Sequence, residues 1–311
     1  MKIVFMGTPD FSVPALDALV EGGHEVALVV SQPDKPKGRG KAMQMTPVKA
    51  RAVELGLPVA TPAKVRGNEE FLAQLRAIDP DVIVVIAYGQ ILTRDVLYLA
   101  KYGCVNIHAS LLPKYRGAAP IQWAVIDGEK VSGVTTMQMN EGIDTGDMLD
   151  RVEVELAEDE TGGSLFDKLA AAGGKLILET LEKIENGTSV PIPQVGESNY
   201  VGTISKSMGE IDWNKSAVVI ERLIRGLNPW PSAYTWLDGK TIKLWKAKVN
   251  AYPSDASCLP GQIIKTDKDS FTVQCGEGTL TITELQLEGK KRMDTGAFLR
   301  GYSVNPGQKL G

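Results

Sequence analysis

The sequence lacks any apolar run long enough to cross a membrane. Its longest apolar stretch, residues 82–88, has the length of a single strand, whereas a membrane-spanning helix needs about 18 or more apolar residues in succession. The first residues, MKIVFMGTPDF, interrupt a short apolar run with Gly, Pro and Asp, so we expect no signal peptide. These absences predict a cytoplasmic protein that has no membrane partner.

Cysteine is also scarce, and two common cofactor motifs are missing. The three cysteines, Cys104, Cys258 and Cys275, are widely spaced and form no CxxC pair, which indicates neither a disulfide framework nor a zinc site. The segment MGTPDF after the first expected strand has neither GxGxxG nor the Gly-Lys-Ser/Thr of a P-loop. A nicotinamide enzyme is therefore disfavoured, and we expect no metal ion.

Length and charge distribution indicate two domains. A chain of 311 residues is long for one α/β core, and its content of 43% apolar and 23% charged residues is ordinary for a globular protein. Residues 206–311 hold 15 basic and 11 acidic side chains, net +4, whereas residues 1–205 hold 19 and 27, net −8. A basic C-terminal part suggests a polyanionic partner, but such an excess is also common on a solvated face.

The first two-thirds of the chain alternate between strand and helix patterns. Residues 82–87 are apolar throughout, as in a strand buried on both faces of a parallel sheet, and Thr46-Pro47 is typical of a helix start. The patterns predict strands at 3–6, 25–31, 82–87, 103–107 and 133–139, and helices at 12–23, 46–56, 68–79, 120–126 and 164–185. This succession predicts an α/β fold with a doubly wound, Rossmann-like sheet.

The sequence changes character after residue 187. Residues 187–205 show neither the helical nor the strand periodicity of apolar residues, and they contain two prolines and three glycines. This composition predicts an interdomain linker. After a helix at 216–225, short β-like runs alternate with turn signals such as Asp238-Gly239, as in a small OB-like antiparallel β-barrel. We therefore expect three parts: a catalytic domain at 1–187, a linker at 188–205 and an OB-like domain at 206–311.

Asn106 and His108 form the first candidate site. They end the apolar strand GCVNIHAS, and open α/β sheets bind ligands at the carboxyl ends of their strands. Two residues apart in a strand, they point to the same side, roughly 7 Å apart along the backbone. An amide and an imidazole together can stabilise the oxyanion of an acyl transfer. His108 alone fits a structural role equally well, and we expect His24, in a GGHEV turn, to be solvated.

A glycine-punctuated acidic loop forms the second candidate site. The sequence NEGIDTGD holds Glu141 and Asp144, and Gly142 and Gly146 permit a tight backbone path that presents Asp144 inward. A carboxylate facing an imidazole can accept or relay a proton. From composition alone, an acidic turn at a sheet edge is an equally good interpretation.

Longer stretches form a joint pattern over essentially the whole chain. They are NIHASLLPKYRGAAPIQWAVIDGE and QMNEGIDTGD, supported by MGTPDFSVPALDAL, QPDKPKGRGKAMQMTPVK, DVIVVIAYGQIL and NPWPSAYTW. This pattern resembles the folate-dependent formyltransferases, and most closely the members that act on initiator methionyl-tRNA. The resemblance implies transfer of the formyl group of 10-formyltetrahydrofolate to the α-amine of methionyl-tRNA, a step in the initiation of protein synthesis.

The resemblance also implies roles for individual residues. Asn106 and His108 are expected to stabilise a tetrahedral intermediate, with Asp144 as proton relay. The folate site is expected to comprise Ser110, Leu111, Leu112, Pro113, Ile86, Tyr88, Gly89, Ile91, Leu92, Asn140 and Gly142. Residues 110–113 by themselves also fit a rigid turn. Thr93 departs from the proline that the family more often has at the pocket margin.

The segment 32–49 bears on the second substrate. It carries five basic residues against the single Asp34, with two glycines between them, and by itself it fits a solvated surface loop. The resemblance makes it the insertion that reaches the tRNA acceptor stem. The expected tRNA contacts are Lys35, Lys37, Arg39, Lys41, Lys206, Lys243, Lys246 and Lys248, with Lys290, Lys291 and Arg292 as further candidates.

Three other functions stay open. A formyltransferase acting on a nucleotide-linked amino sugar resembles the chain in both domains, but so small a substrate does not explain the basic loop at residues 32–49. Glycinamide ribonucleotide transformylase lacks the second domain. A non-catalytic RNA-binding protein on the same fold has no need of Asn106, His108 and Asp144 together. We expect an active enzyme, and a monomer.

Overall fold

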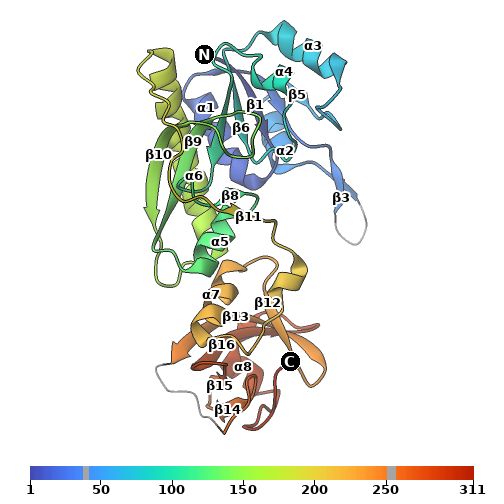
Figure 1. Cartoon of the computed structure of the whole chain (residues 1–311). Helices are drawn as coiled ribbons and strands as arrows, with labels where there is room; N and C mark the ends of the chain where they lie inside the picture. The colour runs from blue at the N-terminus through green and yellow to red at the C-terminus, as the bar shows by residue number, and fades with distance from the viewer. Residues whose placement is uncertain (38–41, 251–256) are drawn as a thin grey trace. The chain divides into compact units, whose positions relative to one another are not determined.

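The computed structural model describes residues 1–37, 42–250 and 257–311, which form two compact units (Figure 1). Unit 1 comprises residues 1–120, 131–155 and 166–201. Unit 2 comprises residues 121–130, 156–165 and 202–311. The predicted Arg39 and Lys41 contacts lie outside the described residues.

A seven-stranded sheet forms the centre of unit 1, in the order β10-β9-β7-β6-β1-β2-β5. Its parallel strands are β1 (Lys2–Gly7), β2 (Glu25–Val30), β5 (Val59–Ala60), β6 (Val82–Ile86) and β7 (Cys104–His108). Its antiparallel strands are β9 (Val131–Gln138) and β10 (Met148–Glu155). The parallel-dominated, Rossmann-like sheet confirms the predicted fold class, whereas strand β10 was not predicted.

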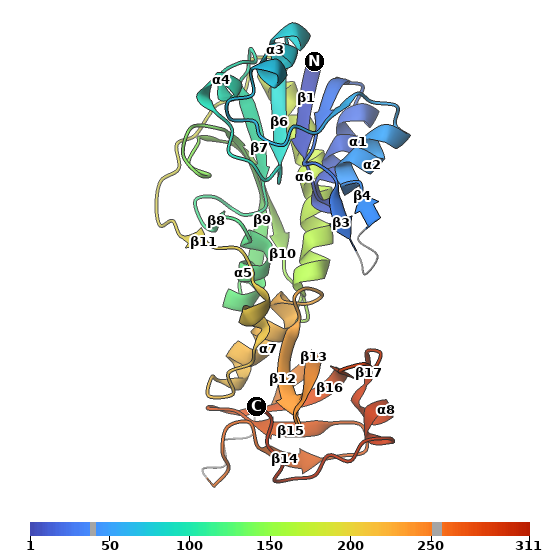
Figure 2. The ribbon, with the colours of Figure 1, turned by 90° about the vertical axis from the view of Figure 1, so that its right-hand side faces the viewer.

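Helices cover both faces of this sheet (Figure 2). They are η1 (Asp10–Ser12), α1 (Val13–Glu21), α2 (Pro47–Glu54), α3 (Glu69–Ile78), α4 (Arg94–Leu97) and α6 (Gly162–Glu185). Helix α5 (Pro120–Asp127) belongs, apart from its first residue, to unit 2. Helices α3 and α4 share one apolar cluster with β1, β2 and β6. On α6, a Cβ added to Gly173 would lie 3.0 Å from the Ile107 side chain, so the glycine lets this helix pack closely on β7.

Two predicted helix starts have the expected caps. The Thr46 hydroxyl accepts a hydrogen bond from the Lys49 N–H at 3.1 Å, ahead of Pro47 at the first turn. The Asn68 side chain accepts from the Phe71 N–H at 3.0 Å. Each cap satisfies an N–H group that has no partner within the helix, which is why these short polar residues mark the boundaries so reliably.

Two small sheets complete unit 1. Strands β3 (Lys35–Lys37) and β4 (Ala42–Gln44) form an antiparallel pair within the predicted basic loop. Strands β8 (Arg116–Gly117) and β11 (Tyr200–Val201) form a parallel pair. Strand β11 belongs to the segment predicted as a linker, and it joins that segment to the chain just after His108.

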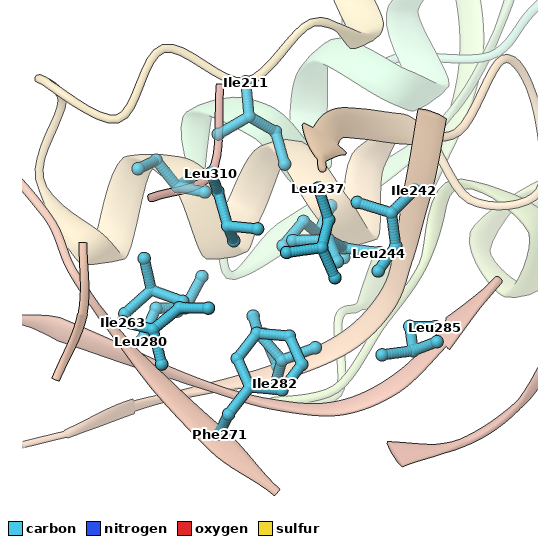
Figure 3. Packing of buried hydrophobic residues seen from close by; sticks show 14 of the residues in the cluster. Ile211, Leu237, Ile242, Leu244, Ile263, Phe271, Leu280, Ile282, Leu285 and Leu310 are labelled. Atoms are coloured by element: carbon cyan, nitrogen blue, oxygen red, sulfur yellow. The ribbon is translucent and has the colours of Figure 1, made fainter. Parts of the chain in front are cut away.

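Unit 2 contains an antiparallel sheet in the order β12-β13-β16-β15-β14, with β17 paired to β16. Its elements are η2 (Lys206–Gly209), α7 (Ala217–Gly226), β12 (Ala233–Leu237), β13 (Lys240–Asn250), β14 (Ile263–Thr266), β15 (Phe271–Gln274), β16 (Thr279–Leu287), β17 (Met293–Asp294) and α8 (Thr295–Leu299). Figure 3 shows its core, in which alternate apolar residues of the strands meet. The antiparallel β domain predicted for the C-terminal part of the chain is confirmed.

The turn between β12 and β13 shows how the sequence sets this sheet. Asp238 and Gly239 both have positive φ, 50° and 74°, as a two-residue hairpin turn requires. The turn pairs Leu237 with Lys240 and so directs Ile242 and Leu244 into the core, where both are fully buried. Among the residues that the structure describes in either unit, no helix is long and apolar enough to cross a membrane.

Candidate active site

Strand β7 carries the two predicted catalytic residues at its carboxyl end. Asn106 and His108 are only 9% and 6% exposed, and their spacing places them on the same side of the strand. The His108 Nε2 atom lies 2.9 Å from the carbonyl oxygen of Tyr115. A carbonyl oxygen can only accept a hydrogen bond, so Nε2 carries a proton in this arrangement. The other ring nitrogen, Nδ1, is left to meet a reacting group.

The predicted acidic loop brings Asp144 to this histidine. An Oδ2 atom of Asp144 lies 3.7 Å from His108 Nδ1, with the two side chains 16% and 7% exposed. That separation is within ion-pair range but longer than a hydrogen bond. In neutral imidazole, Nδ1 is an acceptor and so is the carboxylate, so the space between them favours a group that carries a proton.

The acidic loop reaches His108 by a folded path. Strand β9 runs antiparallel to β7 and pairs Gln138 with Val105 and Thr135 with His108. The loop therefore leaves β9 at the level where β7 begins, about 10 Å from His108 at the strand's rise per residue. Residues 140–147 return toward His108, so the two sites meet through a folded loop rather than through neighbouring strand ends.

The backbone of the acidic loop is tightly constrained. Asp144 has a φ of +52°, in the left-handed region that Asp and Asn tolerate better than other residues with a side chain. A Cβ on Gly146 would lie 1.7 Å from the carbonyl oxygen of Gln138, so only glycine fits there. The Gly117 N–H donates to Asp144 Oδ2 at 2.8 Å. These contacts fix where the carboxylate points.

The predicted folate residues after β6 are held mainly through their backbone. The carbonyl of Ile86 accepts from the Ser12 hydroxyl at 2.8 Å, and that of Tyr88 accepts from the Thr8 hydroxyl at 2.8 Å. The Tyr88 and Leu92 side chains belong to the apolar core, and burial raises the pKa of Tyr88 to about 12. Their side chains therefore do not face a ligand, and only their backbone is placed for one.

The second predicted folate loop contacts helix α4, which follows the first. Tyr98 donates to Glu141 at 3.0 Å, and Arg94 lies 3.4 Å from the same carboxylate. Hydrogen bonds to the Glu141 carboxylate, from the backbone N–H of Glu141 and from the Tyr98 hydroxyl, lower the pKa of this residue. Ile91 of one loop and Ile143 of the other are 71% and 59% exposed. The two loops thus present apolar side chains and backbone groups, a combination suited to a flat heteroaromatic ring.

Within the same loops, Gly89 and the Asn140 side chain have backbone roles. Gly89 adopts a φ of +86°, which glycine tolerates best. Asn140 Oδ1 accepts from the Gly142 N–H at 3.0 Å and from the Thr145 hydroxyl at 2.8 Å. Asn140 therefore shapes the acidic loop from within, and Gly142 keeps its N–H pointed at that side chain.

The segment Ser110–Pro113 makes a compact turn after His108. The Ser110 hydroxyl donates to the Lys114 carbonyl at 2.6 Å, and Thr135 bridges the Ser110 carbonyl and the Leu112 N–H at 2.7 and 3.2 Å. Leu112 is buried, while Leu111 and Pro113 are partly exposed. The hydroxyl predicted for folate contact is thus engaged with the backbone, and the partly exposed side chains are the ones free of the core.

Of the predicted tRNA contacts of unit 1, Lys35 and Lys37 lie on β3, which pairs with β4 in the basic hairpin. Lys35 is exposed there, and Lys37 ends β3. Lys49 instead binds Asp34 at 2.8 Å, which neutralises both charges at the base of the hairpin. Met43 on β4 is 64% exposed, and Met45 just after that strand is 47% exposed. The hairpin therefore presents both cationic and apolar side chains.

The predicted tRNA contacts of unit 2 gather along η2 and β13. Lys243, Lys246 and Lys248 occupy β13, and Lys206 begins η2, which contacts the neighbouring β12. Two cations lie over the ring of Trp245, Lys243 at 5.9 Å and Arg292 at 4.6 Å. Arg292 also binds Glu284, and this contact lowers the pKa of the carboxyl. The sequence analysis did not predict a role for Trp245. Cation–π contacts with its ring keep these two cations together on one face of the sheet.

Four groups at the site were missed at the level of sequence: the Tyr115 carbonyl, the Gly117 N–H, and the side chains of Gln194 and Asn199. Gln194 donates to the carbonyls of Asp144 and Gly146 at 2.9 and 2.7 Å. Asn199 accepts from the Tyr115 N–H at 2.6 Å. Each of these hydrogen bonds has a backbone group as one partner, so the pattern of residue types does not predict them. The described residues contain no group of three or more His, Cys, Asp or Glu placed to hold a metal ion.

Comparison with known proteins defines the class. Residues 1–181 match the formyl transferase family, and residues 203–303 match the formyl transferase C-terminal domain. The N-terminal match covers more than half of the 311 residues, so the chain belongs to the formyl transferase family. This confirms the resemblance inferred from the NIHASLLPKYRG and NEGIDTGD stretches.

Comparison with individual proteins is more specific than the family match. The chain is 58% identical over 308 residues to a methionyl-tRNA formyltransferase of Agathobacter rectalis, covering 99% of this chain and 98% of that protein. It is 54% identical to the methionyl-tRNA formyltransferase of Lachnospira eligens, over the full length of both. An N-formyltransferase from Helicobacter canadensis, solved with folinic acid and dTDP-3-aminofucose, shares the fold at 18% identity with a TM-score of 0.68, covering 91% of this chain and 98% of that one.

Proposed function

We propose that this protein transfers the formyl group of 10-formyltetrahydrofolate to the α-amine of initiator methionyl-tRNA. The observation that carries the proposal is a His108–Asp144 pair, buried beside Asn106, in a chain 58% identical over its length to a methionyl-tRNA formyltransferase. The reaction is an acyl transfer between two nitrogens. It needs a hydrogen-bonding site for the formyl oxygen and a group that removes a proton from the amine.

The proton is handled between His108 and Asp144. The two acceptors face each other at 3.7 Å, and the ammonium of the aminoacyl group can donate a hydrogen bond to each of them from beside the pair. Loss of a proton to this pair leaves a neutral amine, which attacks the formyl carbon. Once His108 holds the proton on Nδ1, that N–H becomes a donor for the formyl oxygen, while the Asp144 carboxylate stabilises the positive charge of the imidazole.

Asn106 and protonated His108 then stabilise the oxygen. As the new C–N bond forms, negative charge develops on the formyl oxygen, and the Asn106 amide and His108 donate hydrogen bonds to it. Breaking the bond to the donor nitrogen returns a proton from His108 to that nitrogen. In becoming the formamide, the ammonium loses two protons in all: one passes through His108 to the leaving nitrogen, and the other is released to solvent. Removing one donor of this kind commonly costs about 10²–10³ in turnover.

The folate site lies between residues 86–92 and 140–144. Backbone carbonyls held by Ser12 and Thr8 and the exposed Ile91 and Ile143 supply polar edges and apolar faces. Folate supplies the activated formyl group, and no metal takes part. A chelator should therefore leave turnover unchanged, and activity that is lost with EDTA and restored by a divalent ion would contradict this.

Acceptor choice rests on the basic groups. The 32–49 segment, with Arg39, is proposed to reach the acceptor stem, and the β13 lysines to follow the phosphate backbone of tRNA. We place the enzyme in the cytoplasm as a monomer, with a catalytic domain at 1–187, a connecting segment at 188–205 and a tRNA-binding domain at 206–311.

A formyl-transfer assay with three acceptors tests the proposal. The acceptors are charged initiator tRNA, a dTDP-linked amino sugar and glycinamide ribonucleotide. We expect product only with the tRNA. Turnover of the amino sugar with no turnover of the tRNA would replace this acceptor assignment. Deleting residues 35–41 should then raise KM for methionyl-tRNA and leave folate binding nearly unchanged, because the folate loops are other segments of the chain.

A further inference from the structure

Residues 194–201, here called the return segment, contact the catalytic residues although their composition predicts a linker. Strand β11 of the segment pairs with β8, and the Ala118 N–H donates to the Val201 carbonyl at 3.0 Å. The Arg116 N–H donates to the Asn199 carbonyl, also at 3.0 Å. The two family matches end at residue 181 and resume at residue 203, so the return segment lies outside both.

Gln194 holds the acidic loop. Its Nε2 donates to the carbonyls of Asp144 and Gly146 at 2.9 and 2.7 Å. Its Oε1 accepts from Arg116 Nε and Nη2 at 3.0 and 2.8 Å. All four hydrogen-bonding positions of the amide are thus used. Asp144 has a φ of +52°, a conformation that persists only when its surroundings restrain it.

Asn199 holds the other half of the site. Its Oδ1 accepts from the Tyr115 N–H at 2.6 Å, and Tyr115 too has a positive φ, 57°. The carbonyl of Tyr115 is the group that accepts from His108 Nε2. Asn199 therefore orients the peptide groups on both sides of Tyr115, and through them it keeps the imidazole in the Nε2–H form with Nδ1 toward Asp144.

We propose that Gln194 and Asn199 are positioning residues for formyl transfer. Gln194 acts on the Asp144 backbone and Asn199 acts on His108 through Tyr115. The proposal rests on the proposed function of the His108–Asp144 pair. It makes the return segment part of the structure that holds the site, and it predicts a loss in kcat with little change in KM for methionyl-tRNA, because neither side chain lies on the basic strands β3 and β4.

The test for Gln194 separates the role of its NH2 donors from that of its acceptor oxygen. Gln194→Met removes all four bonds at nearly constant length. Gln194→Glu keeps an acceptor for Arg116 but loses both donors to the acidic loop. We expect each variant to lose roughly tenfold to a hundredfold in kcat, the scale of a small misplacement of a reacting group. Gln308→Met is the matched control, since this amide also accepts from a backbone N–H, that of Asn305. Wild-type kcat in Gln194→Glu would overturn the role of the donors.

The test for Asn199 uses a conservative rescue. Asn199→Ala removes the acceptor of the Tyr115 N–H, whereas Asn199→Asp keeps an oxygen in its place. We expect Asn199→Ala to lose roughly tenfold in kcat and Asn199→Asp to stay within about threefold of wild type. Asn186→Ala is the matched control, because Asn186 caps the Thr188 N–H in the same way at 3.1 Å. Equal activity of the Ala and Asp variants would overturn the proposal for Asn199.

A double-variant cycle distinguishes positioning from general damage. If Gln194 acts through Asp144, then Gln194→Met should change kcat little in an Asp144→Asn background, since the group being positioned is already inactive. If the fold-loss in kcat of the double variant equals the product of the fold-losses of the two single variants, the proposal is contradicted. Should Gln194→Met fail to fold, as thermal unfolding would show, the Gln194→Glu variant takes its place in the cycle.

An NMR readout keeps the proposal separate from the proposed reaction. The chain has only two histidines, so nitrogen-15 spectra resolve the ring of His108 without any substrate. We expect the Nε2–H form in the wild type and in Asn186→Ala, and a mixture of forms in Asn199→Ala. An unchanged His108 spectrum in Asn199→Ala would overturn the positioning role. If no acceptor is formylated by the wild type, the proposed function fails while this result still stands.

Discussion

Asp144→Asn is the sharpest test of the catalytic pair. Asparagine keeps an oxygen that accepts from the Gly117 N–H, 2.8 Å away, and tolerates the φ of +52° at this position. The variant therefore removes the negative charge and leaves the loop in place. The lost charge sits 3.7 Å from His108 Nδ1 in a largely buried site, so its interaction with a protonated imidazole is worth at most about 4.5 kcal/mol at an effective dielectric constant near 20.

This ceiling sets the expected kinetics. A loss of about a hundredfold in kcat corresponds to about 2.7 kcal/mol, which lies below the ceiling and within the range for a lost acid–base group. The assay is steady-state formylation of radiolabelled methionyl-tRNA, with thermal unfolding measured in parallel. We expect kcat to fall at least about a hundredfold with an unchanged Tm.

Two companion variants complete this test. Asp147→Asn makes the same chemical change at an exposed site in the same loop, and its turnover should match wild type. Asp144→Ala removes the charge and also places alanine at positive φ, so it should lose stability as well as activity, by roughly 1–2 kcal/mol. If Asp144→Asn keeps kcat within about threefold of wild type, then Asp144 is not the proton-handling group and the reasoning is refuted.

Three further outcomes follow from the structure. Gly146→Ala should destabilise the protein and abolish turnover, because its Cβ would lie 1.7 Å from a backbone carbonyl oxygen; Gly301→Ala, which meets nothing within 4 Å, should match wild type in unfolding and kinetics, and equal behaviour of the two would contradict the close approach. One thiol, the partly exposed Cys258, should react with Ellman's reagent at pH 8 in the native protein, since burial raises the pKa of Cys104 and of Cys275 to about 12; three fast thiols would refute this, and three should appear after denaturation. The KM for tRNA should rise steeply with salt, because each neutralised phosphate releases counterions, and a flat salt profile would argue against a phosphate-tracking surface.

The sequence by itself determined the local structure. Thr46-Pro47 and Asn68 cap their helices because a short polar side chain satisfies an orphan N–H wherever the chain turns helical. Residues 82–86 form a strand buried on both faces because every side chain is apolar. Asp238-Gly239 makes the predicted hairpin. Each of these signals depends on neighbours in the chain, so each could be read without knowledge of the fold.

The family and the candidate residues His108 and Asp144 could also be predicted from the sequence. Asn106 and His108 alternate on one strand end, and the glycines around Asp144 announce a tight loop. That His108 and Asp144 lie 3.7 Å apart is a result of the structure. The antiparallel course of β9 was not readable, because strand direction is set by pairing across the sheet and leaves no periodic trace in one strand.

Only the tertiary structure decided what holds the site together. Gln194 and Asn199 lie some 50 and 84 residues from the backbone groups they bind, in a stretch whose prolines and glycines predict a linker. Their partners are peptide N–H and carbonyl groups, which every residue possesses, so no residue type or spacing marks the contact. A side chain that binds backbone across a long loop acquires its role from the fold, and for that physical reason the return segment could be recognised only after the chain had folded.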